Sequence, residues 1–193
     1  VLARPAPALV TLNGREVGQT PVTVQLADLD QLNELSARLE GQNLSETRVL
    51  FLDANRLRVE YRFDSEPTPL AKALGLARIL VFDYGEQVTF DVDRADLKPA
   101  ATPLLERQAV MLKAQFATVD VFVCGHTDST GGEAHNLELS LERARTVADF
   151  LKGQGVDGGR VRIQGFGQAF PVASNDTPAD RARNRRTEIV LPQ

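Results

Sequence analysis

The sequence predicts an α+β protein built from two blocks, and three observations support this. In the second block, apolar strand-like runs alternate with helix-like segments without hairpin turns between them, which indicates strand–helix–strand crossovers and a layer of helices on one face of a sheet. In the first block, a tight-turn dipeptide and one strictly alternating run indicate a smaller α+β module. The polar join, with its two prolines, predicts a linker at 64–69. We therefore expect a module of unknown function at 1–78 and a second domain at 79–193.

The first block opens with a predicted hairpin and a predicted helix. Asn13-Gly14 follows a short apolar segment and favours a tight turn, after which segment 22–26 reads as the partner strand. Asp28 can cap a helix that Gly41 ends. The apolar positions of that helix recur at helical spacing: Leu29, Leu32, Leu35 and Leu39.

Two further strands are predicted before the linker. Segment 48–52 reads as one strand, and segment 57–63 as another whose residues alternate between apolar and charged. The charged face of the second strand is basic, so it is either solvated or a contact surface for a partner; its arginines are Arg56, Arg58 and Arg62. After the linker, the segment from Leu70 reads as a short helix that leads into an apolar strand at 79–82.

The second block contains the regular alternation. Its predicted strands are at 88–92, 119–124, 160–165 and 187–191, and its predicted helices at about 99–116, 133–152 and 178–184. Pro99 and Pro178 suit the start of a helix, and Gly153 suits its end. Arg143 lies at the edge of the apolar stripe of the longest helix. That stripe consists of Leu137, Leu141, Ala144, Ala148 and Leu151.

Composition and charge exclude several classes of protein. Of the 193 residues, 42% are hydrophobic and 25% are charged, as in ordinary globular proteins. The net charge of −4 argues against a nucleic-acid binder, and no run of about 18 apolar residues is present to span a membrane. The chain begins at Val1 rather than Met, so we expect a mature or trimmed fragment whose membrane tether would lie upstream.

The most informative pair of residues is an acid in a turn and a base in a helix. Asp128 lies in a glycine-bounded turn after a strand, where ligands bind in α/β sheets, and Arg143 lies fifteen positions later inside the next helix. An acid and a base offered together suit a zwitterion that carries an ammonium and a carboxylate on the same carbon. The alternative, which the residues alone leave open, is a local Asx turn at Asp128 and a solvated Arg143.

Other chemistries lack the residues that they need. Cys124 is the single cysteine and ends an apolar run, so a buried small side chain is favoured over a catalytic thiol. His126, Asp128 and His135 are possible metal ligands, but two of them share one turn. Ser129 beside them is not part of a hydrolase triad, because triad groups converge from separate elements. We therefore expect no catalysis, no metal and no cofactor.

Near the C-terminal end, four arginines lie within six residues: Arg181, Arg183, Arg185 and Arg186. An RNA-binding patch would need aromatic residues for stacking, and it would suit an acidic chain poorly. Such a cluster otherwise pairs with acids or is solvated. In a third interpretation, one or two of its members hold a ligand carboxylate through guanidinium forks.

The region around Asp128 carries an extended motif. It consists of Thr127-Asp128, ten residues, Leu139-Ser140, two residues, Arg143-Ala144, two residues and Val147. Further motifs lie in the same order at 90–99 and at 165–189, the second with Asn184-Arg185-Arg186. Together these motifs resemble the OmpA-like C-terminal domain family, which includes the peptidoglycan-associated lipoproteins and the flagellar stator protein MotB. The resemblance covers about residues 86–191.

The resemblance implies a βαβαβ-type fold with a mixed sheet, located in the periplasm and tethered to the outer membrane of a Gram-negative bacterium. It implies non-covalent binding of the diaminopimelate of peptidoglycan stem peptides, with Asp128 receiving the ammonium and Arg143 the carboxylate. The implied ligand-binding residues are Thr127, Asp128, Asn136, Leu139, Arg143, Asn184, Arg185 and Arg186. The N-terminal module would then contact other envelope proteins. The alternatives are a regulatory interaction module without wall binding and an enzyme that acts on peptidoglycan.

Overall fold

The computed structural model describes residues 1–27, 29–53, 55–85, 90 and 93–193. Its contacts divide the chain into two compact units. The first unit consists of 1–50, 56–81 and 192–193, and the second of 51–55 and 82–191. We describe each unit by itself.

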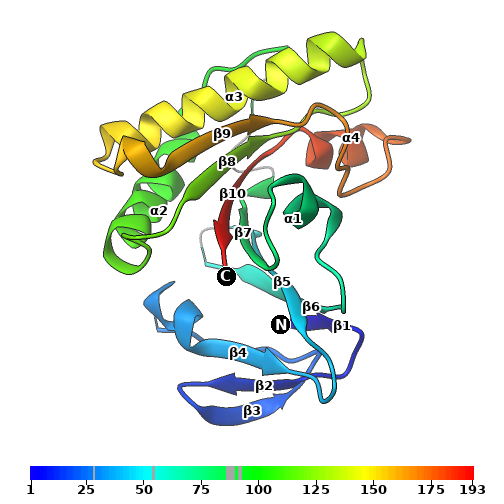
Figure 1. The fold of residues 1–193 in the computed structure, drawn as a ribbon, viewed down its shortest axis with the longest axis vertical. Helices are drawn as coiled ribbons and strands as arrows, with labels where there is room; N and C mark the ends of the chain where they lie inside the picture. The colour runs from blue at the N-terminus through cyan, green and yellow to red at the C-terminus, as the bar shows by residue number, and fades with distance from the viewer. Residues whose placement is uncertain (28, 54, 86–89, 91–92) are drawn as a thin grey trace. The chain divides into compact units, whose positions relative to one another are not determined.

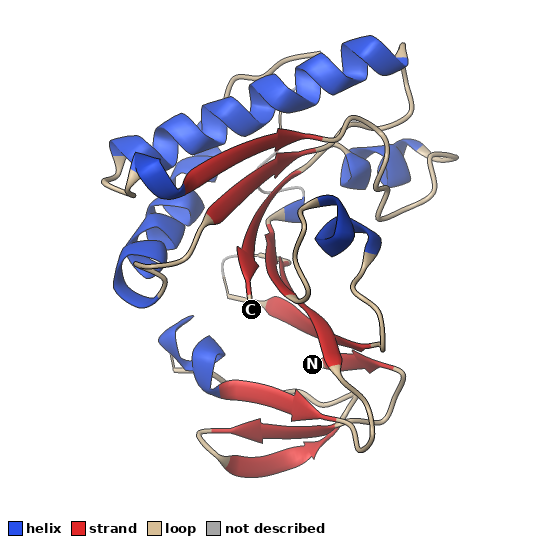
Figure 2. Cartoon of the chain, in the orientation of Figure 1, coloured by secondary structure: helices blue, strands red, loops and turns tan. Residues whose placement is uncertain are grey.

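The first unit contains a three-stranded sheet in the order β3-β2-β4 (Figures 1 and 2). Its strands are β2 (Leu9–Leu12), β3 (Arg15–Gln19) and β4 (Leu35–Arg38). The predicted hairpin turn is confirmed, because Asn13 and Gly14 both have positive φ, at 53° and 72°. The predicted partner strand at 22–26 is wrong. Antiparallel pairing resumes directly after the two-residue turn, with Leu12 opposite Arg15.

The helix predicted from Asp28 onward is also wrong. A short 3-10 helix, η1 (Leu29–Glu34), is followed by β4, and Asp28 itself lies outside the described residues. β4 pairs antiparallel with β2, and the Leu35 carbonyl accepts a hydrogen bond of 2.8 Å from the Tyr61 hydroxyl. These long-range partners override the helical spacing of the leucines.

Four further strands, which lie wholly or mostly in the first unit, follow the order β1-β6-β5-β7. They are β1 (Leu2–Arg4), β5 (Leu44–Phe51), β6 (Leu57–Phe63) and β7 (Ile79–Asp83), with the short helix α1 (Pro69–Ala73) before β7. The strand predicted at 57–63 is confirmed, including its alternation. Val59, Tyr61 and Phe63 are buried, whereas Arg58 and Arg62 are exposed. β1 pairs with β6 in parallel.

The second unit confirms the predicted mixed sheet. Its strands lie in the order β10-β8-β9, where β8 pairs antiparallel with β10 and parallel with β9. The strands are β8 (Val121–Gly125), β9 (Val161–Gly165) and β10 (Thr187–Pro192). Between them run η3 (Pro99–Ala101), α2 (Thr102–Gln115), α3 (Glu133–Gly153), η4 (Gly158–Arg160) and α4 (Pro178–Asn184). Most of the strand predicted at 88–92 lies outside the described residues.

Helix α3 packs against β8 and β9, and α2 packs beside α3 (Figure 1). The contact with the strands is unusually close at Gly125 and Gly165, the last residues of β8 and β9. A Cβ atom at Gly125 would lie 1.9 Å from the Ser140 carbonyl oxygen, and one at Gly165 would lie 2.8 Å from the Leu141 amide nitrogen. Glycine at these two strand ends therefore lets the helix backbone rest directly on the sheet.

The buried face of α3 differs from the predicted stripe. Leu137, predicted to face the sheet, is 52% exposed. Arg143, predicted at the edge of the stripe, is buried. The buried positions are Asn136, Leu139, Ser140, Arg143, Ala144, Val147, Ala148 and Leu151. The polar members belong to the N-terminal half of the helix, so that half contributes to a polar site as well as to the core.

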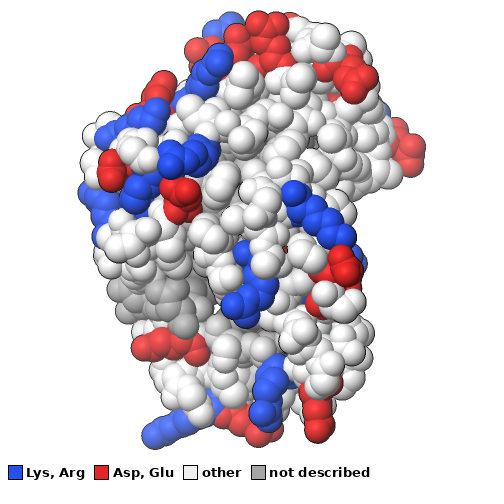
Figure 3. Space-filling model, viewed as in Figure 1, with Lys and Arg blue, Asp and Glu red and all other residues white. Residues whose placement is uncertain are grey.

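The part of the chain that the structure describes has no helix long and apolar enough to cross a membrane. On the face shown in Figure 3, acidic and basic side chains are interspersed rather than gathered by sign. The four arginines of the C-terminal cluster are not exposed together as an RNA-binding patch would require, because Arg186 is buried and Arg181 and Arg185 are half-buried.

Candidate binding site

A cavity of about 580 Å³ lies in the second unit, bordered by the turn after β8, the first half of α3, and α4. Six of the eight predicted ligand-binding residues line it: Thr127, Asp128, Asn136, Leu139, Arg143 and Arg185. Their convergence follows from the topology. β8 ends beside the start of α3, and the close strand–helix contact at Gly125 places the helix over the turn.

Asp128 is held as a carboxylate on the cavity wall. One carboxylate oxygen accepts a 2.8 Å hydrogen bond from the Thr130 amide, and the other accepts a 2.7 Å hydrogen bond from Arg185 Nη1. Burial pushes the pKa of Asp128 upward, but the hydrogen bonds from Arg185 and Thr130 outweigh it, so the pKa lies below its ordinary value. Asp128 is thus a fixed negative charge. The local Asx-type hydrogen bond from the Thr130 amide is present, but Asp128 also has a charged partner, Arg185.

Arg143 is buried rather than solvated, with 1% of its surface exposed. Its Nε donates a 2.9 Å hydrogen bond to the Arg94 carbonyl, and its guanidinium carbon lies 5.1 Å from the centre of the Phe90 ring. Burial, and then the positive charge of Arg185, lower the pKa of Arg143 to about 10, partly opposed by Asp128. Arg143 therefore stays protonated at neutral pH, on an aromatic platform that orients its guanidinium.

A loop after β9 supports the cavity wall from behind. The Thr127 amide donates a 2.9 Å hydrogen bond to the Gly167 carbonyl. The Asn136 side-chain amide donates to Gln168 Oε1 at 3.3 Å and to the Asp128 carbonyl at 3.4 Å. The loop thereby fixes two wall residues that come from different elements.

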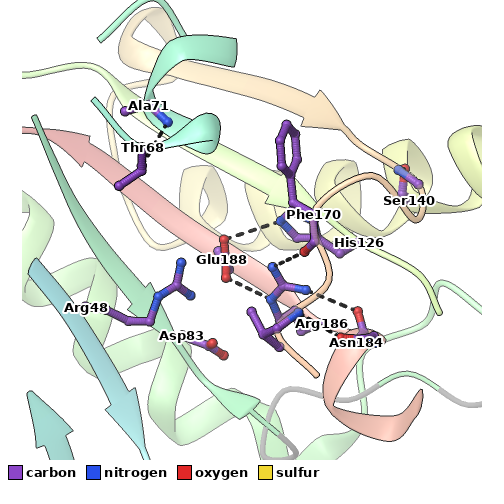
Figure 4. Close-up of polar contacts among 12 residues, drawn as sticks. Arg48, Thr68, Ala71, Asp83, His126, Ser140, Phe170, Asn184, Arg186 and Glu188 are labelled. Atoms are coloured by element: carbon purple, nitrogen blue, oxygen red, sulfur yellow. Dashed lines mark hydrogen bonds and ion pairs between the residues drawn. The ribbon is translucent and has the colours of Figure 1, made fainter. Parts of the chain in front are cut away.

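The two remaining predicted ligand residues, Asn184 and Arg186, do not line the cavity and bind the protein itself (Figure 4). Asn184 accepts hydrogen bonds from the amides of Val172 and Ala173 and donates one to the Ala173 carbonyl. Asn184 therefore closes the loop after β9, and a contact between Asn184 and a ligand stays a prediction.

Arg186 is a buried structural cation. Its Nε donates to Glu188 Oε1 at 2.8 Å, and its Nη2 donates to the Phe170 carbonyl at 3.0 Å. Glu188 is 0% exposed and also lies 3.3 Å from His126 Nε2. Arg186 therefore connects strand β10 to the loop that supports the cavity, with Glu188 balancing its charge.

The residues considered for thiol catalysis and metal binding have structural roles or lie at the cavity; they are Cys124, His126 and His135. Burial raises the pKa of the Cys124 thiol well above its ordinary value, so no reactive thiolate forms there. His126 is stacked on Phe166 and paired with Glu188 in the interior, whereas His135 is paired with Asp93 at the surface. Within the described residues, no three of His, Cys, Asp and Glu gather as metal ligands.

Six further residues line the cavity without having been predicted: Asp93, Thr130, Gly131, His135, Pro178 and Arg181. Some of these could have been inferred. Arg181 already belonged to the arginine cluster considered for a ligand carboxylate, and it lies four residues before Arg185, at the end of the helix predicted at 178–184. Asp93 is different, because only the fold brings it to His135, at 2.6 Å between Oδ1 and Nε2.

The cavity thus presents one carboxylate, Asp128, and a buried guanidinium, Arg143, to the same volume. A carboxylate receives an ammonium and a guanidinium receives a carboxylate, and both bonds are strengthened by charge. The rest of the wall carries both charged and uncharged groups: Asp93, His135, Arg181 and Arg185 line it together with neutral polar residues and the Leu139 side chain. The arrangement can hold a zwitterionic amino-acid group.

Residues 89–185 match the OmpA family. The chain is 46% identical over 112 residues to "Probable lipoprotein YiaD" of Escherichia coli, covering 58% of this chain and 51% of YiaD. It is 45% identical over 107 residues to "Peptidoglycan-binding protein ArfA" of Mycobacterium bovis, covering 55% of this chain and 32% of ArfA. The chain therefore spans about half or less of the length of these relatives.

Among solved structures, the chain is similar to the peptidoglycan-associated lipoprotein from Burkholderia pseudomallei. The sequences are 31% identical, the TM-score is 0.51, and the match covers 54% of this chain and 87% of that chain. Domains of this family are non-enzymatic, in agreement with the predicted absence of catalysis. The family match spans just over half of the chain and contains the whole cavity lining, so this protein belongs to the OmpA family.

Proposed function

We propose that the protein binds peptidoglycan non-covalently through the diaminopimelate of the stem peptide and anchors an envelope protein to the cell wall. In this proposal, Asp128 receives the ligand ammonium and Arg143 receives the carboxylate on the same carbon. Thr127, Asn136, Leu139 and Arg185 complete the pocket. The protein works in the periplasm, with a tether to the outer membrane.

One observation carries the proposal: a fixed carboxylate and a buried guanidinium line the same cavity of an OmpA-family domain. Diaminopimelate offers the matching pair of charges at its side-chain end. A relative named as a peptidoglycan-binding protein and a structural neighbour named as a peptidoglycan-associated lipoprotein support the choice of ligand. The first unit then serves to contact other envelope proteins.

The test is calorimetric titration with a diaminopimelate-containing peptide. Asp128→Asn keeps the shape of the side chain but removes the charge, so affinity should fall about 10- to 150-fold, the equivalent of about 1.5–3 kcal/mol. Arg143→Lys should bind more weakly than wild type because an ammonium cannot form the bidentate fork. Arg145→Lys is the matched control, since Arg145 lies on the exposed face of the same helix.

Sedimentation with insoluble peptidoglycan completes the test. The wild type should pellet with the wall and release no soluble fragments, whereas Asp128→Asn should stay in the supernatant. Folded variants that bind as tightly as wild type would place the ligand elsewhere. Release of soluble fragments by the wild type would favour the enzyme alternative.

A further inference from the structure

The cavity carries more positive charge than a zwitterion can use. Three guanidinium groups line it, from Arg143, Arg181 and Arg185. Among the described residues of its lining there are two carboxylates, and both have partners: Asp128 binds Arg185 at 2.7 Å, and Asp93 binds His135 at 2.6 Å. A ligand group with one ammonium and one carboxylate adds no net charge, so this excess would remain.

Arg181 carries the positive charge that has no carboxylate partner among the described residues of the cavity. Its Nη1 donates to the carbonyls of Asn175 and Asp176, at 2.8 and 3.2 Å, which fixes the side chain on the cavity wall. In the part of the chain that the structure describes, its other guanidinium N–H groups have no acceptor. A half-buried guanidinium that is held in place and keeps free donors is a ready partner for an anion.

Helix geometry gives the distance of this partner from the first site. Arg181 lies on α4, and Arg185, four residues later, is the residue that caps its C-terminal end; the Arg185 amide donates to the Arg181 carbonyl at 3.1 Å. This backbone bond closes one helical turn, so the two backbone positions lie about one helical pitch of roughly 5.4 Å apart. Both side chains line the cavity, and Arg185 binds Asp128, so Arg181 offers a further guanidinium to the volume in which the ligand ammonium is proposed to lie.

We propose that Arg181 forms a second anion subsite, which binds a further carboxylate of the same ligand. The cavity volume of about 580 Å³ suits a ligand larger than one amino acid, since drug-sized ligands occupy pockets of about 300–1,000 Å³. In a stem peptide, the matching group is the free α-carboxylate of the glutamate that precedes diaminopimelate. This inference rests on the proposed function and extends it from one residue of the ligand to two.

The experiment uses two dipeptide probes that differ in a single charge. Both contain N-acetylated glutamate joined through its side chain to diaminopimelate; one has a free glutamate α-carboxylate and the other an α-carboxamide. The wild-type chain should bind the acid about tenfold more tightly than the amide, as expected for one partly exposed charge-assisted contact. Arg181→Gln should remove this preference, so that the variant binds the acid and the amide with equal affinity.

Arg183→Gln is the matched control. Arg183 lies on the same helix but is exposed and does not line the cavity, so its variant should keep the preference for the acid. Equal binding of both probes by the wild type overturns the second subsite and leaves the proposed function intact. A preference that survives in Arg181→Gln assigns the carboxylate to another residue and also overturns it. Failure of the wild type to bind either probe rejects the proposed function, and this inference with it.

Discussion

At the scale of single residues, Asp128 couples the binding site to the stability of the fold. Its pKa is lower in the folded chain than its ordinary value, so the charged form stabilises the fold. This contribution is fully present above the unfolded pKa and is lost as pH falls through the folded value. We predict that Asp128→Asn lowers the free energy of unfolding by about 1 kcal/mol at pH 7.

Chemical denaturation of both proteins between pH 7 and pH 2 measures this contribution. The difference in unfolding free energy should narrow only below about pH 4, where an ordinary aspartate takes up its proton. A difference that stays constant down to the lowest pH would show that the charge of Asp128 contributes nothing to stability.

Individual side chains also show where prediction from sequence ends. Asp128 could be placed in a cavity because a strand, a turn and a helix follow one another locally. Arg143 could be assigned to the correct helix, but its burial depends on Phe90 and the Arg94 carbonyl, which lie about fifty positions away. Arg185 and Arg186 are adjacent and chemically identical. Only the direction of the chain after α4 decides that the first faces the cavity and the second the core.

At the scale of elements, the contact between α3 and the strand ends depends on the absence of a side chain. Gly125→Ala would place a methyl group 1.9 Å from the Ser140 carbonyl oxygen. Backbone atoms cannot yield as a flexible side chain can, so we predict a loss of about 3 kcal/mol or more in unfolding free energy. Gly153→Ala is the control, because open space surrounds this helical position, and it should be neutral or stabilising by about 0.5–1 kcal/mol. Thermal denaturation of the two variants compares them directly.

The loop after β9 gives a second prediction at this scale. Arg186 fixes the loop through the Phe170 carbonyl, and the loop holds Thr127 through the Gly167 carbonyl. Arg186→Lys removes the planar fork, so ligand affinity should fall about fivefold although Arg186 does not line the cavity. Hydrogen exchange at the Thr127 amide should become faster.

Arg160 provides the matched control for this loop. It is also an arginine that fixes a loop, by donating to the carbonyls of Phe116 and Val119, but it does not line the cavity. Arg160→Lys should lower the unfolding free energy by a similar amount, about 1–3 kcal/mol, without changing affinity. If both variants weaken binding equally, the effect of Arg186 is a general loss of stability and not the positioning of the loop.

Prediction of whole elements succeeded where the local pattern and the tertiary contacts agree. β6 alternates in sequence and in burial, so its bounds could be predicted without error. The leucines of 29–39 have helical spacing, yet Leu35 begins a strand because β2 offers an unpaired edge. The sequence around Leu35 does not indicate that β2 will pair with it, so the strand could not be predicted locally.

At the scale of the whole molecule, we keep the division between residues 78 and 79 as a proposal. A fragment of residues 79–193 should fold and should bind the diaminopimelate peptide within about threefold of the full chain, because every residue that lines the cavity lies within it. Circular dichroism and calorimetry test the two parts of this prediction. A folded fragment without affinity would show that residues before 79 contribute to binding.

The fragment should nevertheless be less stable than the full chain. Residues 51–55 belong to the second compact unit, and the Phe51 ring stacks on Tyr84 with centroids 5.1 Å apart. Loss of this ring should cost about 1–3 kcal/mol. The substitution Phe51→Ala in the full chain should reproduce most of that loss.

The bond between Arg185 and Asp128 has one more consequence for the proposed ligand binding. In the free chain, the Asp128 carboxylate proposed to bind an ammonium already accepts a hydrogen bond from Arg185. A simple amine, such as a lysine side chain, would have to evict Arg185 and leave it without an anion. An amino-acid group also carries a carboxylate. When its ammonium displaces Arg185 from Asp128, this carboxylate can pair with the guanidinium groups nearby. The pocket should therefore bind a group that carries both charges on one carbon, and should discriminate against the many lone amines of the envelope.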